Sequence, residues 1–314
     1  MLMVAMNGFL AVAAFLSLAL AVPKSPLSPK CPIILDGRIP KDTPVSTFDT
    51  DASPFDPKYT KGQNLTWSQI IKYPRVAPSK FDDEVNARPI EVTINDQSLF
   101  ASGGTNVQYG FRRAGLLLGN GSDASNTGIR TFHWSIRQDP SRKLNLTHEY
   151  MLVWHEANDF ASNQWSLNAG ILLEQDKPKD TNGSTTGLDK SLWKILDRKN
   201  NVIWTGLIDL YGWENFGILM DHEKNWQLTN VSTIQVFYSK GYYPLQSVTK
   251  SISNDNSGGG QFQIGVLKKP TETESVVFDG FQEAGIDEGQ IYGGIFVENS
   301  AQDCISGSEF QSHI

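Results

Sequence analysis

One stretch decides how this chain folds: His148-Glu149-Tyr150-Met151-Leu152-Val153-Trp154-His155-Glu156. It is short, rich in Tyr, Val and Trp, and bounded by polar residues, which predicts a β-strand. Because side chains alternate between the two faces of a strand, the even-numbered residues are expected to share one face. That face carries His148, Tyr150, Leu152, Trp154 and Glu156. An aromatic pair beside a terminal carboxylate is typical of a sugar-binding cleft, where aromatic rings stack on sugars and carboxylates transfer protons.

Segments of the same kind recur along the chain, separated by Gly, Asn, Asp and Pro. Helical periodicity is scarce, and we expect only one or two short helices, one of them near residues 189–196. Many strands at short spacing, without regular intervening helices, predict an all-β jelly-roll β-sandwich rather than a parallel sheet. The predicted strands are 90–94, 109–118, 128–137, 150–156, 163–173, 202–210, 233–238, 261–267, 275–281 and 291–298.

Several predicted strands combine an apolar row with a polar row. His133, Gln164 and Asn168 alternate with large apolar side chains, and Arg113 and Gly115 face away from a row of aliphatic residues. Such polar rows indicate one of two structures: the concave face of a glycan-binding jelly roll with an open cleft, or an ordinary sheet with one solvated face.

The N-terminus has the pattern of a secretory signal peptide. Residues 8–21 are small and apolar and end in Ala19-Leu20-Ala21, a small-x-small cleavage pattern. The stretch is short for a membrane span. We therefore expect residues 1–21 to be removed, and residues 22–314, which contain no wide linker, to form a single secreted, extracellular domain.

Glycosylation signals agree with export. Five Asn-x-Ser/Thr acceptors follow the predicted signal peptide, more than chance single matches would explain. They are expected to lie in surface loops or at strand ends. The acceptor residues are Asn64, Asn120, Asn145, Asn182 and Asn230.

The chain has two cysteines, Cys31 and Cys304. Two free thiols are one interpretation, but an oxidising compartment favours a disulfide that ties the first strand to the last. By the loop-entropy relation so long a loop contributes up to about 5 kcal/mol. The spacing excludes a zinc site built on clustered cysteines.

Charge and motifs exclude several functions. The net charge of −7 and the isoelectric point of 5.3 argue against nucleic-acid binding, which needs clustered Lys and Arg. The chain has no P-loop, dinucleotide fingerprint or Gly-x-Ser-x-Gly motif, so no cofactor is expected. His148 and His155 lie an odd number of residues apart, on opposite faces of the predicted strand, so they predict no shared metal ion. Nothing in the sequence suggests an oligomer, so a monomer is expected. Nothing suggests that a membrane is a partner.

Carboxylates are the candidates for acid/base chemistry. Glu149 and Glu156 are separated by seven residues, roughly 23 Å along a strand, whereas glycosidase carboxylates lie ~5 to 9.5 Å apart. A catalytic pair must therefore join different strands. Glu156 is the first candidate, the alternative being a strand-end ion pair with Arg112 or Arg113. Glu149 is a weaker candidate. His133 is either an acid/base group or a simple hydrogen-bonding residue.

A second polar and aromatic cluster follows residue 208. It is predicted to be a loop between strands, the usual place for a cleft wall. It supplies His222 as a candidate ligand-binding residue, and Glu214 as a candidate carboxylate. Its members are Asp209, Tyr211, Trp213, Glu214, Asp221 and His222.

Five motifs in a fixed order carry a resemblance. They are Cys31-Pro-Ile-Ile-Leu-Asp-Gly-Arg38, Ser53-Pro-Phe55, Gly110-Phe-Arg-Arg-Ala114, Leu144-Asn-Leu-Thr-His-Glu-Tyr150 and Ile291-Tyr-Gly-Gly-Ile-Phe-Val-Glu298. Together they resemble the catalytic domain of glycoside hydrolase family 131, which comprises secreted fungal β-glucanases. The resemblance implies a β-jelly roll with an open cleft and hydrolysis of β-1,3, β-1,6 and β-1,4 glucans.

The resemblance also bears on the site. It implies acidic catalytic residues lining the cleft, one of which corresponds to Glu156. It further implies a glutamate directly after Gly-Phe-Arg-Arg-Ala, where this chain has Gly115. The second carboxylate would then be another residue, such as Glu214 or Glu298.

Three hypotheses follow. The first is a β-glucan hydrolase in which Tyr150 and Trp154 stack on glucose. The second, motivated by Gly115, is a glucan-binding protein without catalysis, and the third is a secreted surface protein whose aromatic residues form only a core. In the first hypothesis the polar ligand-binding residues are Arg113, His133, His148, Gln164, Asn168 and His222.

Overall fold

The computed structural model describes residues 31–119, 124–173, 189–222 and 232–309. The predicted signal peptide lies outside these residues, as do the acceptors Asn120, Asn182 and Asn230. Among the described residues, no helix has the length and apolar character needed to cross a membrane.

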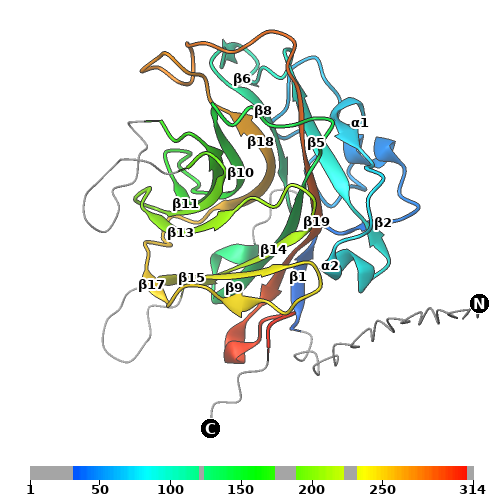
Figure 1. Cartoon of the computed structure of the whole chain (residues 1–314), viewed down its shortest axis with the longest axis vertical. Helices are drawn as coiled ribbons and strands as arrows, with labels where there is room; N and C mark the ends of the chain where they lie inside the picture. The colour runs from blue at the N-terminus through cyan, green and yellow to red at the C-terminus, as the bar shows by residue number, and fades with distance from the viewer. Residues whose placement is uncertain (1–30, 120–123, 174–188, 223–231, 310–314) are drawn as a thin grey trace, which may run out of the picture.

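Two antiparallel sheets pack face to face, which confirms the predicted all-β sandwich (Figure 1). The nine-stranded sheet runs β16-β15-β14-β9-β19-β5-β3, with β1 paired to β19 and β17 to β15. Its strands are β1 (Ile33–Asp36), β3 (Ile71–Lys72), β5 (Ile90–Asn95), β9 (Ile129–Gln138), β14 (Glu214–Asp221), β15 (Thr233–Lys240), β16 (Gln246–Ser247), β17 (Ile252–Ser253) and β19 (Asp287–Asn299).

The six-stranded sheet runs β13-β12-β11-β10-β18-β8. Its strands are β8 (Arg112–Leu117), β10 (Glu149–Glu156), β11 (Asn163–Gly170), β12 (Leu192–Asp197), β13 (Val202–Leu207) and β18 (Gln261–Lys268). Two small ribbons complete the strands: β2 (Ile39–Pro40) with β4 (Ala87–Arg88), and β6 (Ala101–Ser102) with β7 (Asn106–Val107).

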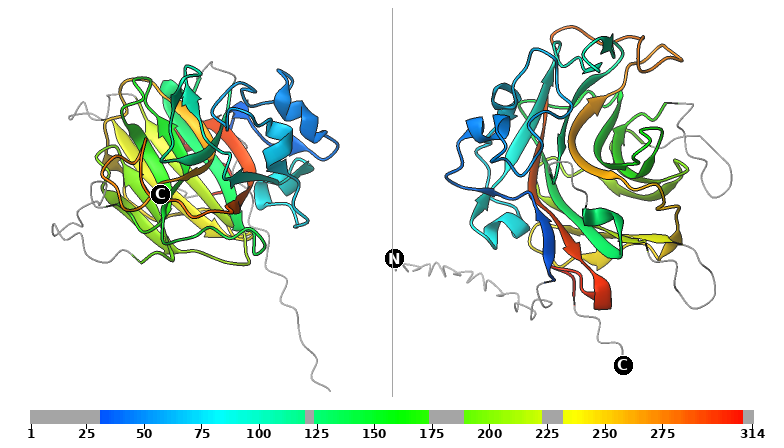
Figure 2. Two further views of the ribbon diagram at one scale, coloured as in Figure 1. Left: turned by 90° about the horizontal axis from the view of Figure 1, so that it is seen from above. Right: turned by 180° about the vertical axis from the view of Figure 1, so that it is seen from behind.

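Helical segments are short and peripheral. The helix α1 (Trp67–Ile70) packs beside β3 and β5, and α2 (Lys80–Asp83) packs against β19, on one flank of the molecule (Figures 1 and 2). Among the described residues, the 3-10 turns η1 (Val45–Asp49), η2 (Ala124–Asn126) and η4 (Ala301–Asp303) lie in connections.

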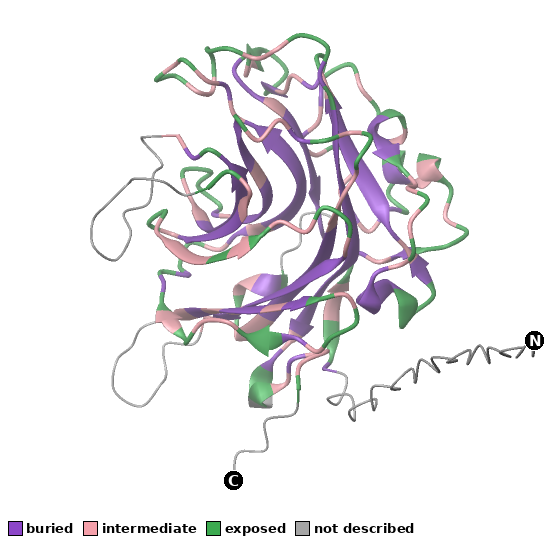
Figure 3. Cartoon of the chain, in the orientation of Figure 1, coloured by how far each residue is buried: buried purple, intermediate pink, exposed green. Residues whose placement is uncertain are grey.

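The core between the sheets is built on stacked aromatic rings. Trp134 of β9 stacks on Trp165 of β11 at 5.4 Å between centroids and on Phe216 of β14 at 5.1 Å. The central strands of both sheets are accordingly buried along most of their length (Figure 3). The alternation predicted for the segments that became β9 and β11 is confirmed for Phe132, Trp134, Ile136, Trp165, Leu167 and Ala169, which enter this core. Ile171 was also predicted to be in the core, but it lies beyond the end of β11 and is 46% exposed.

The strand β10 departs from simple alternation. Its register shifts between Met151 and Val153 against both neighbours, so that Leu152 and Val153 are both buried in the core. A bulge of this kind reverses the faces of the residues that follow it. Tyr150 therefore lies between the sheets, whereas Trp154 and Glu156 face outward. The prediction that all three share one face was wrong.

Other segments also differ from prediction. Residues 189–196 were expected to be helical, but β12 is a strand in which Trp193 and Ile195 alternate into the core. The predicted strand 275–281 is a turn-rich loop. Residues 214–221 were predicted to lie in a loop, yet they form β14 between β9 and β15.

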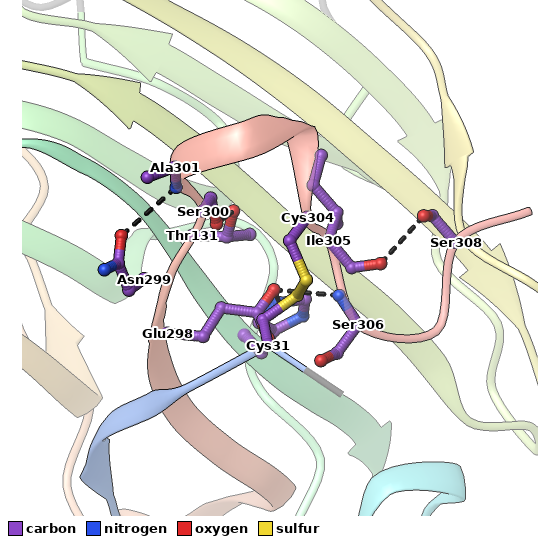
Figure 4. The surroundings of a disulfide bond; sticks show 11 residues. Cys31, Thr131, Glu298, Asn299, Ser300, Ala301, Cys304, Ile305, Ser306 and Ser308 are labelled. Atoms are coloured by element: carbon purple, nitrogen blue, oxygen red, sulfur yellow. Dashed lines mark hydrogen bonds and ion pairs between the residues drawn. A yellow bond between two sulfur atoms is a disulfide. The ribbon is translucent and has the colours of Figure 1, made fainter. Parts of the chain in front are cut away.

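The disulfide between Cys31 and Cys304 is confirmed, with 5.7 Å between the Cα atoms (Figure 4). It joins the residues before β1 to those after β19. Beside it, Ser306 N donates a hydrogen bond to Glu298 Oε1 at 2.8 Å, so the segment after β19 covers the end of that strand.

Candidate active site

A polar cluster occupies the outer face of the six-stranded sheet, and we call Tyr59, Glu156, Gln261 and Gln263 the Glu156 cluster. Glu156 Oε2 accepts a hydrogen bond from Gln263 Nε2 and lies 3.5 Å from the Tyr59 hydroxyl. That hydroxyl donates to Gln261 Oε1 at 2.6 Å and accepts from Gln263 Nε2 at 3.2 Å. One oxygen of Glu156 is therefore fixed by its neighbours.

The folding of two neighbouring strands brings these residues together. Glu156 of β10 pairs with Gln261 of β18, and Trp154 pairs with Gln263. Gln261 and Gln263 alternate with the buried Phe262 and Ile264, which places both glutamines on the outer face. This alternation was visible in the sequence, although the two glutamines were not among the predicted site residues.

Tyr59 reaches the cluster from the segment beside the edge strand β8. Thr60 O accepts a hydrogen bond from Gly115 N at 2.9 Å, which holds this segment along β8. Burial and then the negative charge of Glu156 raise the pKa of the Tyr59 phenol, so the hydroxyl remains protonated. No local sequence pattern could have identified Tyr59, because its partners lie 97 and 202 residues away.

The other oxygen of Glu156 is chemically available. Within the described ranges no donor lies at hydrogen-bond distance from Oε1, and the side chain is partly exposed. A carboxylate with one oxygen fixed and one open has the geometry of a general acid or base. The alternative role of Glu156, an ion pair with Arg112 or Arg113, is not found among the described residues.

Arg113 shares the outer face with this cluster. Its guanidinium is buried, donates to Gln108 Oε1 at 3.3 Å and lies 5.6 Å from the centre of the Phe100 ring. Burial lowers the pKa of Arg113, while the charge of Glu156 opposes that shift. Its positive charge thus acts on Glu156 without a direct contact.

Gly115 lies beneath the cluster and is covered by Trp154. A Cβ atom at position 115 would lie 3.0 Å from Trp154 Cη2 and 3.1 Å from Gln263 Oε1. The indole is 0% exposed, so it is not presented for stacking on a ligand in this conformation. Trp154 Nε1, Gln263 Oε1 and Arg113 Nε are buried without a hydrogen-bond partner in the described part of the chain. Each buried polar group without a partner calls for an explanation, such as a bound water or a catalytic role.

Glu149 lies at the opposite end of β10. Its carboxylate accepts hydrogen bonds from Asn168 Nδ2 and Leu173 N, each at 2.8 Å, and pairs with Lys269 Nζ at 2.9 Å. Both Glu149 and Asn168 are therefore engaged in a buried network, away from the Glu156 cluster.

Tyr150 and His148 are engaged elsewhere too. The Tyr150 hydroxyl donates to Glu288 Oε2 at 2.6 Å inside the sandwich. His148 Nδ1 lies 2.8 Å from Lys269 O, and its Nε2 lies 2.9 Å from Glu283 Oε2. Neither side chain reaches the outer face near Glu156.

His133 lies on the other sheet. Its Nε2 is 2.8 Å from Glu298 Oε1, both side chains are fully buried, and the imidazole stacks on Phe296. Gln164 lies in β11 of the six-stranded sheet, where its Oε1 contacts His155 Nδ1 and its Nε2 donates a hydrogen bond to the carbonyl oxygen of Ser257. The structure does not bring these residues to Glu156.

The remaining candidates lie in or beside the nine-stranded sheet. His222 follows β14, and its backbone N–H donates a hydrogen bond to Gly128 O at 3.0 Å. Glu214 is buried and accepts from Trp193 Nε1 at 2.7 Å and from the Tyr238 hydroxyl at 2.6 Å. Neither Glu214 nor Glu298 can therefore act with Glu156. Among the described residues, no three His, Cys, Asp or Glu side chains are grouped to hold a metal ion.

Comparison with known proteins agrees with this fold. The catalytic domain of a β-glucanase of glycoside hydrolase family 131 from Podospora anserina is 17% identical, with a TM-score of 0.64 over 88% of this chain and 98% of that chain. The catalytic domain of a family 131 protein from Coprinopsis cinerea is 16% identical, with a TM-score of 0.60 over 90% and 100%. No curated protein matches the chain.

The family is established by the sequence itself. Residues 33–303 match the profile described as the glycoside hydrolase 131 catalytic N-terminal domain. This span includes both sheets and every member of the Glu156 cluster. The chain therefore belongs to glycoside hydrolase family 131 and is, by that membership, a glycoside hydrolase.

Proposed function

We propose that this chain hydrolyses β-glucans, at β-1,3 and β-1,6 linkages and also at β-1,4 linkages, with Glu156 as one of two catalytic carboxylates. The observation that carries the proposal is the Glu156 carboxylate, fixed on one oxygen by Gln263 and Tyr59 and open on the other. The substrate class follows from the relative in Podospora anserina, which is described as a β-glucanase.

In this proposal the chemistry is general acid/base hydrolysis. One carboxylic acid protonates the glycosidic oxygen, and the second carboxylate activates water or attacks the anomeric carbon. The substrate lies in an open cleft over the outer face of the six-stranded sheet.

The test is product formation. The purified protein is incubated with laminarin, a β-1,6-glucan and a soluble cello-oligosaccharide, and the oligosaccharides released are measured over time. Glu156→Gln is expected to lower the rate by roughly 10²–10⁴, the usual contribution of an acid/base group. Glu274→Gln, an exposed glutamate, is the matched control and should retain the full rate. Full glucanase activity in Glu156→Gln would exclude the assignment.

One observation favours a second candidate function, glucan binding without cleavage. Position 115, where the family resemblance implies a glutamate, is a glycine covered by Trp154. A binding protein would be retained on immobilised glucan and would release no new reducing ends. A surface protein without a sugar site would show neither property.

The proposed function also includes an extracellular location and a monomeric state. The protein acts outside the cell as a monomer, after removal of residues 1–21. Of the predicted glycosylation acceptors in the described ranges, Asn64 is exposed, which suits attachment of a glycan, whereas Asn145 is partly exposed and its Nδ2 donates to Glu283 Oε1.

A further inference from the structure

A tyrosine-rich surface lies outside the Glu156 cluster, on two loops of the nine-stranded sheet. The first loop, residues 208–213, contains part of the polar and aromatic cluster found in the sequence and leads into β14. The second is the turn after β15, residues 241–244. These loops expose Tyr211 at 75%, Tyr242 at 61% and Tyr243 at 67%, and we call the three residues the tyrosine patch.

The two loops are joined to each other. Because β14 and β15 are paired, with Glu214 opposite Lys240, their loops leave the sheet side by side. Gly241 N donates a hydrogen bond to Trp213 O at 2.8 Å, and Lys240 Nζ lies 3.7 Å from Asp209 Oδ2. The three tyrosines therefore belong to one region of the surface.

Buried polar side chains hold both loops in place. Glu214 Oε2 accepts a hydrogen bond from Asp209 N at 2.9 Å, and Asp209 Oδ1 accepts one from Tyr211 N at 2.9 Å. Asn215 Nδ2 donates to Gly241 O at 2.8 Å. Both Glu214 and Asn215 are fully buried. The tyrosines are thus carried on a fixed backbone, so little loop entropy would be lost when a ligand binds.

The side chains of this region suit a neutral ligand that is rich in hydroxyl groups. A tyrosine presents a flat apolar ring that can stack on a sugar and a hydroxyl that can hydrogen-bond to it. Asp209 lies beside Tyr211, and Asp83 accepts a hydrogen bond from the Tyr242 hydroxyl at 3.4 Å. Carboxylates in these places disfavour nucleic acid and anionic lipid, which bind to clustered Lys and Arg.

The size of the tyrosine patch suits a polymer that is held weakly at many places. Three tyrosines of ~200 Å² each, exposed by about two-thirds, present roughly 400 Å². A stable protein interface takes about 800 Å² from each partner. A polysaccharide needs no such area, because a chain already held at one site reaches a second site at high effective concentration.

The tyrosine patch is separate from the candidate active site. The strand β13, which leads into the first loop, ends at Leu207, opposite Leu192 at the start of β12. This end of the six-stranded sheet carries Glu149, at the start of β10, whereas Glu156 ends that strand. The length of β10, roughly 23 Å, exceeds the reach of a short oligosaccharide but not that of a long glucan.

We propose that Tyr211, Tyr242 and Tyr243 form an accessory binding site for polymeric β-glucan, which keeps the protein on a long chain or particle while the Glu156 cluster acts elsewhere on it. The rings stack on glucose units, and no bond is formed or broken at this site. The choice of glucan as the ligand rests on the proposed hydrolysis. Because the gain comes from effective concentration, it is confined to polymers.

The test compares a polymer with a short substrate. The triple variant Tyr211→Ala, Tyr242→Ala and Tyr243→Ala removes three exposed rings. Its affinity for an insoluble β-1,3-glucan, measured by pull-down in a Glu156→Gln background that prevents cleavage, should fall about ten-fold or more. With Glu156 restored, hydrolysis of that polymer should fall about ten-fold, while kcat/KM for laminaritriose changes by less than about two-fold.

Two further variants control this comparison. Tyr109→Ala changes an exposed tyrosine of another loop and should leave every measurement unchanged. The triple Phe variant at positions 211, 242 and 243 keeps the rings and should retain most of the binding. Loss of binding in the Phe variant as complete as in the Ala variant would contradict stacking.

The remaining outcomes are also decisive. Equal binding by the native protein and the triple Ala variant, or equal losses on polymer and trisaccharide, overturns the accessory site. A native dimer in sedimentation that the triple Ala variant converts into a monomer would assign the patch to contacts between copies instead. A native protein that cleaves no glucan, yet binds the polymer through the three tyrosines, would leave this site standing and refute the proposed hydrolysis.

Discussion

The indole of Trp154 lies directly over Gly115, so close that a Cβ atom at position 115 would be 3.0 Å from Trp154 Cη2. The two residues belong to strands separated by β18 and meet only in the folded sheet. The volume that a side chain at 115 would use is therefore occupied by Trp154, and the two positions are coupled.

Gly115→Glu alone is expected to lower stability rather than to confer activity. Overpacking at a buried position costs about 1–3 kcal/mol. Trp154→Ala alone leaves a cavity and costs about 3–5 kcal/mol. Because each change relieves the other, the double variant should lose less unfolding free energy than the sum of the two single variants. Urea unfolding of all four proteins measures this coupling, and additive losses would show that the contact is unimportant.

Tyr59→Phe is expected to reduce catalysis while the fold remains. The variant removes the hydroxyl that donates to Gln261 and lies beside Glu156. Loss of a hydrogen bond in a cluster with a charged group is worth about 1.5–3 kcal/mol, or roughly a 10- to 100-fold decrease in kcat. KM should change little. Tyr109→Phe, at an exposed tyrosine, is the control. An equal effect of both variants would contradict a positioning role for Tyr59.

Glu91 is expected to make stability depend on pH between about 4.5 and 7. Burial, and then the charge of Asp139, raise the pKa of Glu91 to about 7, although Arg142 opposes the shift. The native state therefore holds the proton more tightly than the unfolded chain. The resulting stabilisation is fully present below pH 4.5 and is lost as the pH rises through 7, with a span of at most about 3 kcal/mol.

Glu91→Gln tests that dependence, because the amide cannot titrate. Unfolding free energies measured from pH 4 to pH 8 should be flatter in the variant, which should also be relatively more stable at neutral pH. Glu84→Gln, at an exposed position, should follow the native curve. If the stability of the native protein rose across this pH interval and Glu91→Gln had no effect on it, the predicted direction of the pH dependence would be wrong.

The paired substitution Cys31→Ser and Cys304→Ser is expected to lower the unfolding free energy. The disulfide spans 273 residues, and closure of so long a loop is worth up to about 5 kcal/mol. Tm should fall, and reduction of the native protein should reproduce the decrease. An unchanged Tm would mean that the remaining contacts of the segment after β19 suffice to hold it.

The alternation of apolar and polar residues was the sequence feature that predicted the faces of the strands most reliably. In β9 and β11, large apolar residues alternate with small polar ones, and their faces could be read directly. In β10, nearly every residue can be buried, so no local sequence pattern indicates the register shift after Met151. The faces of Tyr150 and Trp154 were set by pairing with two neighbouring strands instead.

The candidate site was predictable only in part. Glu156 could be identified because a carboxylate ends a strand of aromatic residues. Tyr59 could not, because it approaches along the edge of β8 from a segment without regular structure. Its position depends on contacts with residues far along the chain, and local sequence patterns do not indicate such contacts.

The central place of β19 governs when the protein can be assembled. This strand, at residues 287–299, lies between β9 and β5 in the middle of the nine-stranded sheet. While the polypeptide leaves the ribosome, β5 and β9 are made long before the strand that joins them, and each keeps an open edge until then. Completion of the sandwich must therefore wait until β19 has been synthesised.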